Sequence, residues 1–214
     1  ADAVSKMKNG KYKDFTMTED ERYELYIAAW LHDCGKVATP PHIVDKSTKL
    51  ETIFDRIELI KTRAELLKKD IEIKFLKSQI SGNKEKYNKA EYEKAIHEID
   101  EDINFLSKCN IGGEFMKPES QERVQSIGSK KVFMKFIEKN LLTDEEIRNL
   151  NIKKGTLLPE EREIINDHIV ITIEMLEQLP YPNNLKNVPE FAGGHHEKMD
   201  GTGYPKGLNE SQMS

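Results

Sequence analysis

Two short stretches, far apart in the sequence, each place metal-ligand residue types side by side. The first, "WLHDCGK", carries His32 and Asp33, and the second, "GGHHEKMDGTGYP", carries His195 and His196. Neutral imidazole and carboxylate are groups that hold iron, manganese or zinc, and a site with two such ions is a common device for phosphoester hydrolysis. The residue types therefore suggest one metal site built from both stretches.

Taken singly, these residues have plainer interpretations. Adjacent residues on a helix point about 100° apart, so a His-Asp pair reaches one ion only at a helix end, which Gly35 would supply. His168 lies in the stretch "NDHIVIT", where a buried histidine bonded to a carbonyl is the favoured interpretation of that residue alone. His195 and His196, by contrast, precede a glycine-rich turn and have no obvious packing role. We expect all five side chains to converge, with Lys36 placed to meet a phosphate oxygen.

The bulk composition limits the classes of function. The 214 residues are 37% hydrophobic and 33% charged, with a formal net charge of -5. This mild acidity argues against binding of a nucleic-acid polymer, which requires a basic excess. Cys34 and Cys109 form neither a CxxC motif nor a disulfide framework, so we expect a reducing, cytoplasmic compartment. No apolar run is long enough to span a bilayer.

Helical patterns dominate, and the predicted fold class is all-α. Thr18 and Glu21 predict a capped helix over 18–31, and Thr143 starts another helix in the same way, with Glu146 three residues on. These patterns place "LHD" at the end of a helix.

Two further helices are predicted without caps of that kind. One covers roughly 119–140. The other is a long helix that opens with Pro159 and ends before Pro180. No strand is predicted.

The charged segment 50–109 predicts an antiparallel helical hairpin. Its arms carry apolar residues at alternating three- and four-residue steps, and Gly82 and Asn83 interrupt the pattern between them. The two apolar seams are Leu50, Ile53, Ile57, Ile60, Ala64, Leu67 and Ile71 in the first arm and Tyr92, Ile96, Ile99, Ile103 and Leu106 in the second. We expect these seams to face each other, and we expect a homodimer through the hairpin because a second copy can complete such a seam.

The two histidine-bearing stretches resemble the signatures of a known family. "LHDCGK" resembles the signature of the HD superfamily of metal-dependent phosphohydrolases, and "HHEKMDGTGYP" resembles the HHExxDGxGYP signature of its HD-GYP branch. "VATPPHIV" and "GTLLPEEREIINDHIVITIEML" are similar to further segments of the family. The resemblance covers 28–43 and 157–208, and the chain between is longer than in typical members. It implies a helical HD-GYP core in two parts, 1–45 and 113–214, with 46–112 inserted as the hairpin.

The resemblance also implies an activity and a site. Such proteins are cyclic-di-GMP phosphodiesterases that open the cyclic dinucleotide to linear pGpG or onward to GMP. It implies two or three divalent metal ions, iron or manganese first, and Lys36 against the scissile phosphate. The implied metal ligands are His32, Asp33, His168, His195 and His196, with Asp33 as the bridge between ions. The implied substrate side of the pocket is the turn of Gly201, Gly203, Tyr204 and Pro205, while Glu197 and Asp200 would hold the loop without binding metal.

The sequence departs from the family pattern at two places. Family members follow the GYP loop with a helix carrying a further metal-binding aspartate, and the sequence given ends at "NESQMS", before such a helix. Some members also use a glutamate ahead of the HD pair, and here Glu19, Glu21 and Glu24 are nearby. We therefore expect weak metal binding in this chain, a segment 193–208 held by little besides metal and the next helix, and sensor domains in a longer parent chain.

Two other functions remain open at this point. The chain could be a receptor that binds cyclic di-GMP without cleaving it and uses the hairpin to contact a partner. It could also be an HD phosphohydrolase for another nucleotide, against which the GYP signature argues.

Overall fold

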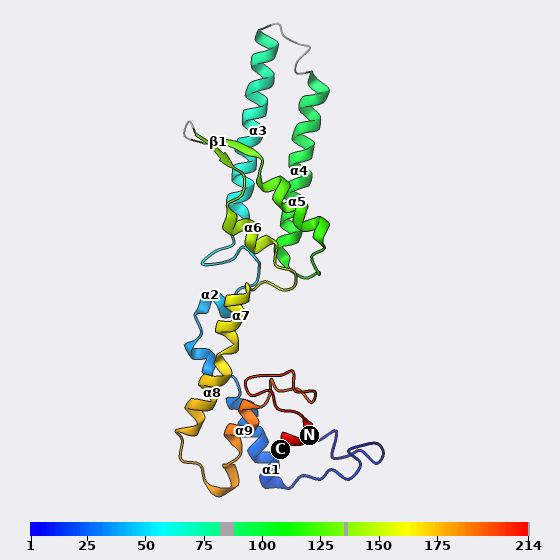
Figure 1. Cartoon of the computed structure of the whole chain (residues 1–214), viewed down its shortest axis with the longest axis vertical. Helices are drawn as coiled ribbons and strands as arrows, with labels where there is room; N and C mark the ends of the chain where they lie inside the picture. The colour runs from blue at the N-terminus through cyan, green and yellow to red at the C-terminus, as the bar shows by residue number, and fades with distance from the viewer. Residues whose placement is uncertain (82–87, 135–136, 214) are drawn as a thin grey trace. The chain divides into compact units, whose positions relative to one another are not determined.

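The chain forms two compact units in a computed structural model that describes residues 1–81, 88–134 and 137–213. The first unit comprises Ala1–Val44 and Glu161–Ser214, and the second comprises Asp45–Glu160. Figure 1 shows that both units are built mainly of helices. The predicted all-α class is therefore confirmed. Within the described ranges, no helix has the length and apolar character needed to cross a membrane.

The first unit is assembled from short helices around a small core. The elements in its N-terminal segment are α1 (Glu19–Leu31), the 3-10 helix η1 (Cys34–Ala38) and α2 (Pro41–Val44). Its C-terminal segment begins within α7 (Pro159–Asn166) and continues with α8 (His168–Glu177), η2 (Asn183–Leu185), α9 (Val188–Gly193) and η3 (Glu210–Gln212). The buried core residues are Ala28, Leu176, Val188 and Ala192. This core joins α1 to the segment that carries His195 and His196.

Helix α1 begins where the sequence predicts. The Thr18 side chain accepts a hydrogen bond from the Glu21 backbone, and the Glu21 carboxylate accepts one from the Thr18 amide. Glu24 is buried, and its carboxylate accepts hydrogen bonds from the Asn187 backbone amide (2.6 Å) and side-chain amide (3.1 Å). Of the glutamates near the HD pair, Glu21 therefore caps α1 and Glu24 anchors α1 to the start of α9.

The prediction of one long helix after Pro159 is wrong in its middle. The helix opens at Pro159 and ends before Pro180 as expected, but α7 stops at Asn166 and α8 starts at His168. The Ile165 carbonyl, which a continuous helix would pair with the amide four residues on, is also bound by the His168 ring. The interruption places His168 at a helix start, where its ring is fixed.

The second unit contains the hairpin. Helices α3 (Ile57–Ile80) and α4 (Lys89–Ile111) lie side by side in Figure 1, and residues of both predicted seams share one core. The prediction of Ile53 in the first seam is wrong, because this residue precedes α3 and is 94% exposed. The first helix begins at Ile57 and not at Leu50, because the Asp55 carboxylate binds the Ile57 amide and ends the preceding turn. Gly82 and Asn83, predicted as the break between the arms, lie outside the described residues.

The helix predicted over 119–140 is wrong beyond its first half. Helix α5 (Pro118–Gly128) is followed by two antiparallel strands, β1 (Lys131–Met134) and β2 (Ile137–Asn140), with Val132 opposite Lys139. A side chain at Gly128 would lie 2.8 Å from the Ile147 Cδ1, so the backbone there packs directly against α6 (Asp144–Leu150). The helix ends at this contact, and the β-branched and aromatic residues after it form a strand instead.

The two ends of the second unit lie together. The Thr156 hydroxyl donates a hydrogen bond to the Lys46 carbonyl, with 3.0 Å between the oxygens, and the Lys46 ammonium donates to the Asn149 side chain. The compact second unit extends to Glu160, beyond the predicted end of the insertion at residue 112. That 46–112 is an insertion stays a prediction.

Replacing Thr143 with alanine is expected to lower the free energy of unfolding of the second unit by about 1 kcal/mol. The Thr143 hydroxyl accepts from the Glu146 amide, and the Glu146 carboxylate accepts from the Thr143 amide, as the sequence predicts. Urea unfolding followed by circular dichroism measures the loss. The Thr143→Ser variant keeps the cap and should unfold like the wild type, so equal loss in both variants would contradict a capping role.

Candidate metal centre

The five predicted ligands all sit at helix ends. His32 directly follows α1, and Asp33 directly precedes η1. His168 is the first residue of α8, and His195 and His196 follow α9 after Gly194. Side chains at helix ends can converge on a point that residues inside one helix cannot reach together.

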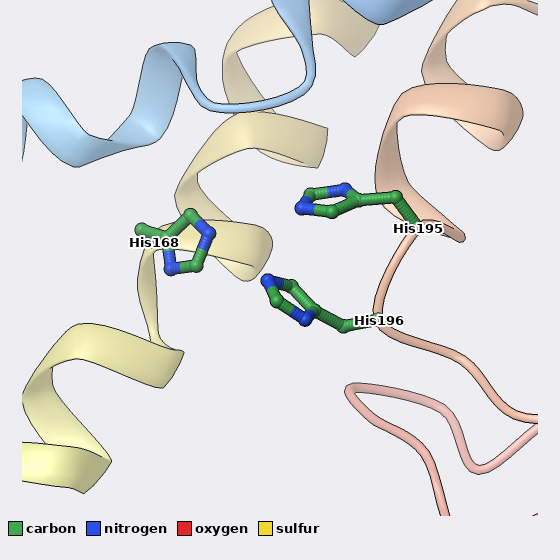
Figure 2. Close-up of side chains that lie close together, drawn as sticks. All are labelled: His168, His195 and His196. Carbon is green, nitrogen blue, oxygen red and sulfur yellow. The ribbon is translucent and has the colours of Figure 1, made fainter. Parts of the chain in front are cut away.

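The convergence predicted from the sequence is present in the structure. Asp33 is central: its Oδ1 lies 3.2 Å from His168 Nε2 and 3.8 Å from His195 Nε2, while its Oδ2 lies 3.3 Å from His32 Nε2. His196 joins through its ring, whose centroid is 4.2 Å from that of His195 and 5.4 Å from that of His168. Figure 2 shows the rings of His168, His195 and His196 turned toward one another.

Three of the histidines are fixed in the same way. The Nδ1 atoms of His32, His168 and His195 each lie against the carbonyl three residues earlier, at Ala29, Ile165 and Ala192 respectively. A carbonyl only accepts, so Nδ1 carries the proton and Nε2 keeps its lone pair. These lone pairs point into the site, which is the arrangement that metal-binding histidines require.

The site has unsatisfied atoms that fit a divalent metal ion. Among the described residues, Asp33 Oδ1 and His168 Nε2 are both buried and make no hydrogen bond, although they lie within 3.2 Å of each other. Buried polar atoms without a partner are uncommon, and each one calls for an explanation. The potential ligand atoms fall into two sets within 4.8 Å: His32, Asp33 and His195, and His168, His195 and His196. Nitrogen and oxygen donors of this kind suit iron, manganese or zinc.

The Asp33 carboxylate is held in its charged form. Burial alone raises its pKa, but the hydrogen bond from Lys36 and the positive potential of His32, Lys36 and His168 outweigh burial and hold the pKa below its usual value. Lys36 Nζ donates to Asp33 Oδ2 at 2.7 Å. An ammonium has three hydrogens, so Lys36 can bind Asp33 and a phosphate oxygen at the same time.

The metal-free protein is expected to lose stability as the pH falls through the ordinary histidine pKa of 6.5. Burial, and then the neighbouring histidines, lower the pKa values of His195 and His196. Between those lowered values and 6.5 the unfolded chain binds more protons than the folded one, so the free energy of unfolding falls with falling pH. Urea unfolding in chelator across this range measures the effect. A His195→Asn, His196→Asn variant should show a shallower slope, and an equal slope in both proteins would contradict this origin.

Gly35 and Thr172 bring the two halves of the site together, and the sequence reasoning missed Thr172. The Gly35 amide donates to the Thr172 hydroxyl at 2.9 Å, and a Cβ at Gly35 would lie 2.1 Å from the His168 carbonyl oxygen. Glycine therefore allows η1 to touch α8 next to both Asp33 and His168. The available signal was a threonine one helical turn after a histidine, in an otherwise apolar stretch.

The loop after the histidines carries its own supports, so the expectation that it is held by little besides metal is wrong. The Glu197 carboxylate accepts hydrogen bonds from the Lys206 amide (2.7 Å) and the Leu208 amide (2.8 Å). The Asp200 carboxylate accepts from the amide and hydroxyl of Thr202. Both acidic residues bind backbone across a turn and hold the loop closed.

The glycines and Tyr204 shape the same loop. Gly201 has a φ of 75°, and a Cβ at Gly203 would lie 2.4 Å from Glu197 Cα, so the backbone folds tightly on itself. The Tyr204 ring stacks on His196 with centroids 4.7 Å apart, and the peptide bond between Tyr204 and Pro205 is cis. The turn predicted to shape the pocket thus contacts one of the predicted ligands through Tyr204.

The fold and the site define a mainly helical protein with a cluster of histidines around one aspartate. Residues 143–214 match a family model described as HD domain. The matched segment is similar to the HD-domain family, and it carries His168, His195 and His196.

Two curated proteins are similar to part of this chain. A "Cyclic di-GMP phosphodiesterase" of Thermotoga maritima is 42% identical over 62 residues, which are 29% of this chain and 17% of that protein. A "3'3'-cGAMP-specific phosphodiesterase 3" of Vibrio cholerae is 39% identical over 62 residues, or 29% of this chain and 13% of that protein. The similarity thus spans less than a fifth of either relative. No solved structure matches the chain.

Proposed function

We propose that this chain is a metal-dependent phosphodiesterase of the HD-GYP branch that hydrolyses cyclic di-GMP to linear pGpG and on to GMP. The observation that carries the proposal is the pair of buried, unbonded atoms, Asp33 Oδ1 and His168 Nε2, which face each other inside a cluster of histidines. The "HHEKMDGTGYP" signature and the names of the two similar proteins support the substrate class.

The ligand atoms form two overlapping sets that could each hold a metal ion, and His195, which has one free ring nitrogen, would bind the ion of one set only. His32 and Asp33 complete one set, and His168 and His196 complete the other. Divalent ions bound there would supply positive charge to the phosphate and lower the pKa of water. The Asp33 side chain touches residues of both sets, which supports its proposed role as the bridge.

Hydrolysis adds one water across one phosphodiester of the ring. The water oxygen bonds to phosphorus, the bond between phosphorus and the 3′ oxygen breaks, and the 3′ oxygen leaves with a proton. Lys36 Nζ, held at Asp33 Oδ2, would bind a phosphate oxygen and stabilise the charge that develops there. Tyr204, with its glycine turn, would cover the substrate side of His196.

The test is turnover by the protein loaded with manganese or iron. Incubation with cyclic di-GMP, followed by chromatography of the nucleotides, should show pGpG and then GMP, and chelator should stop the reaction. Absence of product with either metal would overturn the proposal. Binding of cyclic di-GMP without product would favour the receptor function instead.

A second substrate is favoured by the Vibrio cholerae relative, whose name specifies 3'3'-cGAMP. The same assay with this mixed dinucleotide, at equal concentration, decides between the two. Faster turnover of 3'3'-cGAMP than of cyclic di-GMP would reassign the substrate while leaving the reaction class unchanged.

A further inference from the structure

Helix α3 carries an apolar row that the core of the second unit does not use. The row is exposed, with exposed fractions of 47% for Leu59, 42% for Leu66, 49% for Ile73, 49% for Leu76 and 87% for Ile80. The seam that packs on α4 lies on another face of the same helix and includes Ile60, Ala64 and Leu67. One helix thus presents apolar residues in two directions, and among residues 1–81, 88–134 and 137–213 only one of these faces is covered.

The exposed row follows a heptad repeat. Leu59, Leu66, Ile73 and Ile80 are seven residues apart, and Thr62, Lys69 and Leu76 fill the intermediate positions three residues after each of the first three. All seven residues are exposed. A repeat of 3.5 residues keeps one stripe of a helix facing a partner helix along its length, as in a left-handed coiled coil. We call these seven residues the outer face of α3.

We propose that the outer face of α3 is the interface through which two copies of this chain form a parallel coiled-coil dimer. The charged residues on both sides of the outer face favour a second copy of α3 as the binding partner. The proposal concerns α3 alone and does not depend on the proposed enzymatic function.

The charges flanking the outer face distinguish the two possible helix directions. Glu58, Glu65 and Glu72 line one edge, whereas Arg63, Asp70 and Lys77 line the other edge. In a parallel pair, each residue of the first edge faces the residue five positions later in the second copy. Glu58 then meets Arg63, and Glu72 meets Lys77. The remaining facing pair is Glu65 and Asp70.

An antiparallel pair would instead place like charges together. Glu65 would face Glu72 of the second copy, Arg63 would face Lys77, and Asp70 would face itself. Within one chain, Arg63 already binds Glu146, and the Asp70 carboxylate accepts from the Phe133 amide. The Glu72 carboxylate accepts from Lys69 of its own helix at 2.8 Å, so the principal attraction across a parallel interface is a Glu72 carboxylate shared between this Lys69 and Lys77 of the second copy.

The apolar residues support the same arrangement. Isoleucine at the first heptad position with leucine at the fourth favours two parallel strands, and Ile73, Leu76 and Ile80 have this pattern. The C-terminal half of α3 is therefore expected to hold the dimer most firmly.

The first experiment measures mass in solution. The full chain should have the mass of two copies by sedimentation equilibrium, and a Leu66→Glu, Ile73→Glu variant should have the mass of one copy with unchanged helix content. A Lys74→Gln, Lys94→Gln variant makes the same change in net charge at exposed positions away from the outer face, and it should remain a dimer. A monomeric wild-type chain, or a dimeric Leu66→Glu, Ile73→Glu variant, would overturn the proposal.

The second experiment measures direction. In a background with Cys34→Ser and Cys109→Ser, single Leu59→Cys and Ile80→Cys variants are oxidised separately and as a mixture. A parallel dimer gives disulfide-linked pairs within each separate variant. Cross-linking only in the mixture would show an antiparallel pair and overturn the proposed direction.

Discussion

Replacing Asp33 with asparagine should abolish stoichiometric metal binding and lower phosphodiesterase turnover by about 10³-fold or more. One oxygen of Asp33 faces His168 and His195, and the other faces His32 and Lys36. Asparagine keeps the size of the side chain but removes the negative charge that would offset a bound metal ion. It also leaves the Lys36 ammonium without a carboxylate.

Metal content by elemental analysis and turnover of a cyclic dinucleotide are the two measurements for Asp33→Asn. Asp20→Asn is the matched control, since Asp20 lies exposed in the first turn of α1 in the same unit. The control should bind metal and turn over substrate as the wild type does. An Asp33→Asn protein that retains full metal stoichiometry would show that the bridge is another group.

Replacing Gly35 with alanine should separate the two halves of the site. The added Cβ would lie 2.1 Å from the His168 carbonyl oxygen and 2.6 Å from the Thr172 backbone nitrogen, and backbone atoms cannot rotate out of the way. Overpacking of this kind costs about 1–3 kcal/mol. A displacement of His168 from Asp33 by about 1 Å should reduce turnover about 10²-fold.

Gly113→Ala is the control for Gly35→Ala, because a Cβ at Gly113 would meet nothing within 4 Å. Thermal unfolding, metal content and turnover are measured for both variants. The Gly113 variant should match the wild type in all three. If Gly35→Ala keeps wild-type metal content and turnover, the close contact between η1 and α8 does not position the site.

Much of the site was predictable because its information is local. Adjacent ligand types at a helix end and ahead of a glycine turn are visible in a few residues, and they led to the convergence of His32, Asp33 and the other three histidines. The caps at Thr18 and Thr143 were predictable for the same reason, since a capping box is complete within four residues.

The features that sequence reasoning missed depend on contacts between distant segments. Glu24 becomes an anchor only because Asn187 lies beside it, and Thr172 acts only because Gly35 approaches it. The strand at Val132 was misassigned because a short apolar run fits a helix or a strand equally, and the contact of Gly128 with Ile147 decides between them. The alternation of buried and exposed side chains in a four-residue strand covers too few residues to distinguish it from a helix by sequence pattern.

The hydrogen bond between Thr156 and Lys46 has a consequence for how the site assembles during folding. Gly35 and Thr172 are 137 residues apart in the chain, and closing so long a loop is entropically costly. The segment Asp45–Glu160 has its own core, and its ends meet at Thr156 and Lys46. If this segment folds first, the loop between Gly35 and Thr172 is shortened to roughly 20 residues, and the entropic cost of closing it falls by about 1.7 kcal/mol. Prior folding of Asp45–Glu160 would thus shorten the effective loop between the two halves of the metal centre.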